Sequence, residues 1–246
     1  MERRIVSREQ WLAERKAHLA NEKALTRAYD RLMEERRTLP WVLVEQDYVF
    51  DSEAGPVRLA DLFQGRSQLA VQHFMLPPGG EICPGCASTA DLADPSRRHF
   101  EHADLSFAAV SRAPIAEIAA ARRRMGWTFQ WVSSAGSRFN YDYGVSWTPE
   151  QIAAGDAPYN YGSDTAPIED LHGHSVFARD ESGAIYHTYS TYARGAESVS
   201  GAFGWLDMAP KGRNEGDQIM SWLRRHDEYE DGAATHACCA AAQAAE

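Results

Sequence analysis

The sequence predicts an α/β fold in which helices cover both faces of a sheet with parallel strands. Strand-like and helical segments alternate from about residue 41 onward, which is typical of such folds. The run "QLAVQHFML" (residues 68–76) has the length and largely apolar character of a central strand that is buried on both faces. The chain has 246 residues, 44% hydrophobic and 24% charged, and therefore suits one domain with appendages.

Residues 1–40 are expected to form an N-terminal helical arm. Ser7 and Gln10 have the spacing of a capping box, which marks a helix start. Apolar side chains then recur at helical spacing between charges, at Trp11, Leu12, Leu19, Leu25, Tyr29 and Leu32. The arm packs either on its own domain or on a second subunit, in which case the protein is a homodimer.

The main domain is expected over residues 41–230, and its first half leads to a CxxC motif. Residues 39–53 have the period-two pattern of a strand, and residues 57–67 form a short helical turn closed by Gly65. The central strand at 68–76 follows, and the Pro-Pro-Gly-Gly run at 77–80 forces a loop. After the motif we expect a helix that ends before Pro95.

The second half continues the alternation. A strand at 105–111 precedes a helix at 113–126, with Pro114 in its first turn and Gly126 at its end. A strand at 129–134, a hairpin at 175–191 and a closing amphipathic helix at 214–229 complete the domain.

Two segments lie outside this pattern. Residues 146–174 are rich in Gly, Pro and Asp and are expected to be an insertion, as a surface or lid loop. Residues 231–246 are low in complexity and are predicted to be a disordered tail. The tail carries Cys238 and Cys239, which we interpret as incidental, with a mobile resolving pair as the alternative.

The motif Cys83-Pro-Gly-Cys86 carries the functional prediction. In a strand–loop–CxxC–helix order, Cys83 lies at a helix N-terminus, where free N–H groups and the helix dipole favour thiolate. Cys86 lies one turn further on, within reach of a disulfide. Cys83 would attack a disulfide substrate and Cys86 would resolve the mixed disulfide. No organic cofactor is required.

Two alternatives remain open. Cys83 and Cys86 with His99 and His102 give a spacing of C-x2-C-x12-H-x2-H, close to a zinc site, so a non-enzymatic protein that binds zinc or another soft metal is a competing function. His172 and His174 are the other histidines that could complete such a site. The second alternative is that both cysteines are inert core residues.

Charge and hydropathy exclude several classes of partner. The net charge of −10 argues against nucleic acid and against an anionic membrane surface. No run approaches about 18 apolar residues, and the N-terminus lacks the apolar core of a secretory signal. We therefore expect a cytoplasmic protein, whose partners are a protein or small-molecule disulfide and an unidentified reductant.

Several strings make the chain similar to a bacterial family. They are "LADLFQGRSQLAVQHFM", "CPGCASTAD", "FAAVSRAPIAEIAAARRRMGWTFQWVSS", "FNYDYGVS" and "MSWLRRHDEY". They resemble the DUF899 proteins, an uncharacterised bacterial family with a thioredoxin-like fold. The resemblance implies a three-layer α/β/α thioredoxin-like domain behind the helical extension. It also implies a thiol–disulfide oxidoreductase or a protein related to peroxiredoxins.

The chain departs from these patterns in ways that bear on the chemistry. Glu81 precedes the motif where thioredoxins have Trp, and its charge would oppose a thiolate at Cys83. The segment before the hairpin, "LHGH", lacks the proline that thioredoxins place there. The offsets where peroxiredoxins have Pro and Ser/Thr hold Leu76 and Gly80, which makes an ordinary peroxidase less favoured.

Four other residues are candidate supporting groups. His73 is either a core residue or a group below the CxxC loop, and Arg112 either favours a nearby thiolate or forms a structural ion pair. His172 and His174 either face the dithiol or belong to a surface loop. A three-residue Arg run at 122–124 is expected to be a solvated helix end.

Overall fold

The computed structural model describes residues 4–213, 215 and 219–229. It divides into two compact units, one ending at Trp41 and the other starting at Val42. The first unit contains a single helix, α1 (Arg8–Arg37), and none of its residues is buried. The capping box is confirmed, since Ser7 Oγ accepts a hydrogen bond from the Gln10 amide at 3.2 Å and Gln10 Oε1 accepts one from the Ser7 amide at 3.2 Å.

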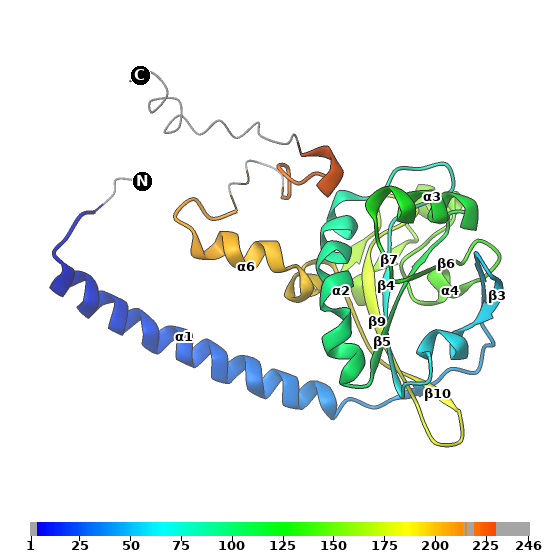
Figure 1. Cartoon of the computed structure of the whole chain (residues 1–246), viewed down its shortest axis with the longest axis horizontal. Coiled ribbons are helices and arrows are strands. Elements are labelled where there is room, and N and C mark those ends of the chain that lie inside the picture. Colours follow the sequence, from blue (N-terminus) through cyan, green and yellow to red (C-terminus); the bar gives the residue numbers. More distant parts are fainter. Residues whose placement is uncertain (1–3, 214, 216–218, 230–246) are drawn as a thin grey trace. The chain divides into compact units, whose positions relative to one another are not determined.

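The second unit is built on an eight-stranded sheet with the order β1-β10-β9-β4-β5-β6-β2-β3 (Figure 1). The central strands β4 (Gln68–His73), β5 (Leu105–Ser111) and β6 (Gln130–Ser133) are parallel. The hairpin of β9 (Gly173–Arg179) and β10 (Ile185–Tyr192) adds to β4 in antiparallel orientation. The edges are formed by β1 (Val42–Leu43) and by the hairpin of β2 (Val49–Ser52) and β3 (Gly55–Arg58).

Helices cover both faces of this sheet. On one face, α2 (Pro84–His102) and α3 (Ile115–Met125) bury a core that includes Phe74, Phe107 and Trp131. On the other face, η1 (Leu59–Phe63) and α4 (Phe139–Asp142) enclose a second core around Phe50 and Phe177. A central strand that leads to the CxxC helix, with parallel neighbours on one side and an antiparallel hairpin on the other, confirms the thioredoxin-like three-layer α/β/α fold.

The remaining elements lie between β6 and the end of the described chain. The segment after α4 forms α5 (Pro149–Ala154), β7 (Pro158–Tyr159), η2 (Asn160–Gly162) and β8 (Asp164–Thr165) around a small core that includes Trp147 and Tyr159. After β10 come η3 (Ala193–Val199), α6 (Gly201–Met208) and η4 (His226–Glu228). No helix in the described part of the chain is both long and apolar enough to cross a bilayer.

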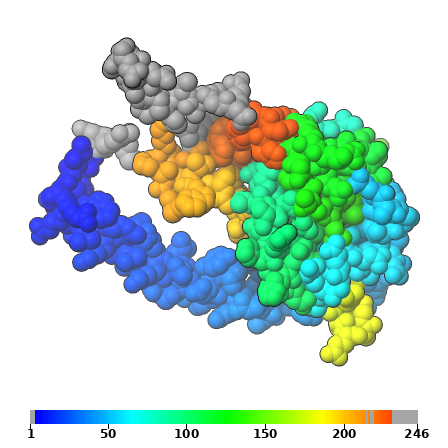
Figure 2. Space-filling model, viewed as in Figure 1, coloured from blue at the N-terminus to red at the C-terminus, as the bar shows by residue number. Residues whose placement is uncertain are grey.

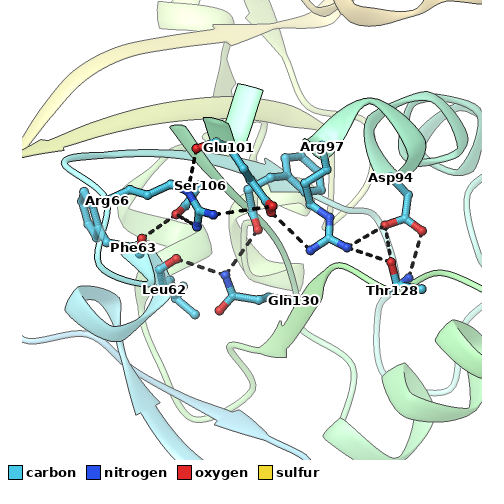
Figure 3. A network of polar contacts seen from close by, with 10 residues as sticks. Leu62, Phe63, Arg66, Asp94, Arg97, Glu101, Ser106, Thr128 and Gln130 are labelled. Carbon is cyan, nitrogen blue, oxygen red and sulfur yellow. Dashed lines mark hydrogen bonds and ion pairs between the residues drawn. The ribbon is translucent and has the colours of Figure 1, made fainter. Parts of the chain in front are cut away.

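The expected end of α2 before Pro95 is wrong, because the helix continues to His102. Proline removes one backbone hydrogen bond, but polar contacts hold the second half of α2 on the sheet (Figure 3). Asp94 accepts hydrogen bonds from the amide and the hydroxyl of Thr128, both at 2.9 Å. Arg97 bonds the same hydroxyl at 2.8 Å and pairs with Glu101 at 3.3 Å.

The closing helix expected at 214–229 is also wrong in the part that the structure describes. Residues 219–222 form turns, and the only helical element there is the short η4. The helix that follows the hairpin is α6, which the sequence pattern did not reveal. Of the three residues expected on the apolar face of that helix, Ile219, Trp222 and Leu223, Leu223 is buried, whereas Ile219 is 64% exposed.

Candidate dithiol site

The structure places Cys83 at the N-cap of α2, as the sequence predicts. A loop of ten residues joins the end of β4 to the helix, and Pro84 occupies its first turn, where a missing N–H has no cost. Cys83 Sγ accepts a hydrogen bond from the Cys86 amide at 3.5 Å. The first sulfur therefore occupies the position of a capping oxygen and lies at the positive end of the helix dipole.

The two sulfurs have opposite acid–base properties. A hydrogen bond from the Cys86 thiol lowers the pKa of Cys83 from its ordinary value of 9.0 to about 7, with the backbone N–H groups of Cys86 and Gly85 adding to the effect against the opposing effect of burial. The pKa of Cys86 is raised, because its thiol donates to Cys83 and because it is buried. Both cysteines are free thiols. The pair thus combines a Cys83 thiol that ionises near neutral pH with a Cys86 thiol that keeps its proton.

The sheet fixes the second cysteine through a residue that the sequence analysis missed. Gln72, on β4, is 1% exposed, and its Nε2 donates to the Cys86 carbonyl at 2.9 Å. The Met75 amide donates to Cys86 Sγ at 3.4 Å. The sequence contained one signal for this role, a glutamine within an otherwise apolar strand, because a buried side-chain amide needs a hydrogen-bond partner.

A pocket of about 360 Å³ opens above the dithiol. His172 and His174 line it from the start of β9, so the structure brings both predicted histidines to the two cysteines. Burial lowers the pKa of His172, and it lowers the pKa of His174 to about 4. Other lining residues come from α2 and from the segment after β10, among them Thr89, Ala193, Phe203, Met220 and Leu223.

The sequence profile of one family, described as "Bacterial protein of unknown function (DUF899)", matches residues 1–229. The chain belongs to this family. No curated protein matches the chain.

Solved structures that resemble this DUF899 protein are distant. Peroxidoxin BcpB from Mycobacterium tuberculosis is 14% identical, with a TM-score of 0.45 over 66% of this chain and 94% of that chain. A cysteine mutant of peroxiredoxin Q from Xanthomonas campestris is 11% identical, with a TM-score of 0.48 over 69% of this chain and 98% of that chain. A shared fold at such low identity does not identify the chemistry of the DUF899 chain.

His73 does not contact the dithiol of the DUF899 protein. It is 1% exposed, its Nε2 hydrogen-bonds to Ser175 Oγ at 2.8 Å, and its ring stacks on Tyr143. Burial lowers the pKa of His73 to about 3, so its ring is neutral. Of the two interpretations of His73, the structure supports the core residue.

Arg112 forms a structural ion pair instead of facing a thiolate. Its Nε and one terminal nitrogen bind the two oxygens of Asp170, both at 2.7 Å, and its other terminal nitrogen donates to the Tyr141 hydroxyl at 2.9 Å. It does not line the dithiol pocket. The guanidinium positions the segment before β9, which carries His172.

Glu81 is paired, which changes its expected effect on Cys83. Its carboxylate binds Arg225 at 2.8 Å, and Arg225 also donates to the Ile82 carbonyl at 3.2 Å. The opposite charges compensate each other close to the motif. The sequence could not show this pair, because its members are 144 residues apart.

Cys83 and Cys86 do not come together with His99 and His102, the histidines that the sequence spacing suggested for a zinc site. His99 and His102 lie in the last turn of α2, and 13 residues of helix put His99 about 20 Å from Cys86. In the part of the chain that the structure describes, no three His, Cys, Asp or Glu residues are grouped so that they could hold a metal ion. Cys238 and Cys239 lie outside the described residues.

Proposed function

We propose that the DUF899 chain is a thiol–disulfide oxidoreductase in which Cys83 is the nucleophile and Cys86 the resolving thiol. The observation that carries the proposal is the asymmetry of the pair. Cys83 caps α2, has a pKa of about 7 and lines a pocket, whereas Cys86 is buried behind it with a raised pKa. A nucleophile with a pKa near ambient pH attacks disulfides fastest.

The reaction balances with the dithiol as the two-electron donor. The Cys83 thiolate attacks one sulfur of a substrate disulfide, which breaks the substrate S–S bond, forms a mixed disulfide and releases the first substrate thiolate. Cys86 then loses its proton and attacks Cys83 Sγ, which forms the 83–86 disulfide and releases the second thiolate. The substrate is reduced to two thiols, and an external dithiol reductant restores the enzyme.

The raised pKa of Cys86 suits its place in this order. While Cys83 is a thiolate, Cys86 keeps its proton and stabilises that charge by a hydrogen bond. Once Cys83 is bonded to substrate, the negative charge is gone and one cause of the raised pKa disappears. Resolution is therefore favoured only after the mixed disulfide has formed.

The test is whether an 83–86 disulfide forms under mild oxidant. Chains carrying Cys238→Ser and Cys239→Ser are treated with diamide, alkylated and mapped by mass spectrometry, beside the same background with Cys83→Ser or Cys86→Ser. We expect one intramolecular disulfide in the parent and none in either variant. A parent that never forms the bond refutes the proposal.

Zinc analysis of the reduced protein tests the metal alternative in the same preparation. Cys83, Cys86, His172 and His174 line one pocket, and near-stoichiometric zinc bound there would support a metalloprotein instead. We expect the redox-competent parent to contain little zinc.

A further inference from the structure

The segment after β10 forms a roof over the dithiol. It comprises η3, α6 and residues 219–229, and its elements η3, α6 and η4 all contact α2 (Figure 2, where the orange and red segments lie against the green helices). A Cβ atom built on Gly85 would lie 3.0 Å from Met220 Cε and 3.8 Å from Cys83 Sγ. The Met220 methyl group therefore sits directly above the CPGC turn.

Ion pairs fasten this roof on either side of the motif. Arg225 binds Glu81 at 2.8 Å and the Ile82 carbonyl at 3.2 Å. On α3, Arg124 binds Asp227 at 2.6 Å. Residues 220–227 therefore lie beside the CPGC turn, on the side from which a large partner would approach Cys83.

Beneath the roof, the pocket has polar groups that no described residue satisfies. Gln72 Oε1 and both ring nitrogens of His174 are shielded from solvent and have no hydrogen-bond partner in the described chain. The two side chains lie opposite each other on β4 and β9, and both line the pocket with the cysteines. Buried polar groups are normally satisfied, so these atoms can hydrogen-bond to a polar group of a ligand or to water.

The rest of the pocket has an apolar wall, and its charged residues are paired. Phe203, Met220 and Leu223 provide the apolar wall. The charged lining residues Arg194 and Glu197 pair with each other at 3.0 Å, and Glu197 also pairs with Arg213 outside the pocket at 3.0 Å. A charged ligand that enters the pocket would lose part of its hydration without gaining a counter-ion, which costs free energy.

We infer that the substrate is a small, uncharged disulfide with apolar arms and a hydroxyl or amide group, and that folded protein disulfides are excluded by the roof. The inference rests on the proposed function and names the substrate class of the same site. A volume of about 360 Å³ lies at the lower end of the range for small-molecule sites and is sufficient for a small disulfide. The dithiol reduces this disulfide to two thiols by the exchange already described.

The experiment compares rates of oxidation of the reduced protein by three disulfides. Hydroxyethyl disulfide is small and uncharged and has hydroxyl groups, dithiodipropionate is similar in size but a dianion, and insulin is a folded protein disulfide. We expect hydroxyethyl disulfide to react at least about tenfold faster than either of the others. Burying an unpaired charge or displacing the roof costs more free energy than a tenfold difference in rate requires.

Variants of the roof anchors separate exclusion by the roof from intrinsic reactivity. In Arg124→Gln with Arg225→Gln the roof loses its ion pairs to α3 and to Glu81, and we expect the insulin rate to rise about threefold or more while the hydroxyethyl disulfide rate changes little. Arg122→Gln is the matched control, because Arg122 lies on α3 but pairs with Glu53, away from the roof. Its insulin rate should equal that of the parent.

The outcomes distinguish this inference from the proposed function. If diamide produces the 83–86 disulfide but insulin or dithiodipropionate reacts as fast as hydroxyethyl disulfide, the substrate class is wrong and the oxidoreductase stands. An unchanged insulin rate in the anchor variant contradicts exclusion by the roof. Failure to form the 83–86 disulfide with any oxidant overturns the function itself.

Discussion

Replacing Cys86 by alanine or by serine tests what makes Cys83 acidic. The Cys86 thiol is the largest contributor to the lowered pKa of Cys83, ahead of the backbone N–H groups at the helix start. Alanine removes this side-chain donor, whereas the serine hydroxyl retains one. Both variants leave the N-cap position of Cys83 and the backbone of α2 in place.

The size of the effect follows from the strength of a hydrogen bond to a charged group. Such a bond contributes about 1.5 kcal/mol, which corresponds to about one pKa unit. We therefore expect the pKa of Cys83 to rise from about 7 to about 8 in Cys86→Ala and to change by less in Cys86→Ser. At pH 7 the thiolate fraction in the alanine variant falls about fivefold, partly offset by the greater nucleophilicity of a more basic thiolate.

The assay is the rate of alkylation by iodoacetamide between about pH 5 and about pH 10, in the Cys238→Ser, Cys239→Ser background. The midpoint of each profile reports the pKa of Cys83. A parent midpoint near the ordinary 9.0 would refute the assignment of the thiolate. Equal midpoints in the alanine and parent chains would instead show that the helix start alone acidifies the sulfur.

Three further predictions concern buried groups of the domain. Burial lowers the pKa of His73 to about 3 and that of His174 to about 4, so below about pH 6.5 the unfolded chain binds more protons than the folded chain. Urea titrations should show the free energy of unfolding falling as the pH is lowered, by about 1.4 kcal/mol per pH unit for each histidine, and His73→Gln should reduce that slope. Arg112→Gln should lower the free energy of unfolding by about 3 kcal/mol through loss of a half-buried pair, yet leave the alkylation profile of Cys83 unchanged; a shifted profile would restore Arg112 as a tuning group. Phe139→Ala should cost about 3–5 kcal/mol in the same titrations, because this fully buried ring packs between Tyr48 and Phe50, and a loss below about 1 kcal/mol would contradict that packing.

Local sequence signals were sufficient to predict the central part of the site. A strand-length apolar run, a Pro-Gly loop and Pro84 after Cys83 each constrain a few neighbouring residues, and together they place the first sulfur at a helix start. The same local logic failed at Pro95, where the helix continues. There the deciding contacts join α2 to Thr128, more than thirty residues away, and tertiary contacts outweigh the local preference.

The roof shows a different limit of sequence patterns. Ile219 and Leu223 have the spacing of an amphipathic helix, but the chain there forms turns, and both side chains line the pocket. Helical periodicity records which side chains face an apolar surface, and a turn that lies over a pocket can satisfy the same pattern. The pattern therefore predicted a buried contact at Leu223 without determining the backbone that makes it.

Glu81 shows how a charge beside the motif is balanced by a distant residue. Considered with its sequence neighbours, this carboxylate is a negative charge two residues before the nucleophile and should raise the pKa of Cys83. In the folded chain Arg225 binds it at 2.8 Å, and the Glu81 side chain is 82% exposed, so solvent also screens its charge. The lowered pKa of Cys83 instead has its causes in the Cys86 thiol and in the N–H groups at the start of α2. Loss of Arg225 should therefore alter access to the pocket more than the acidity of Cys83.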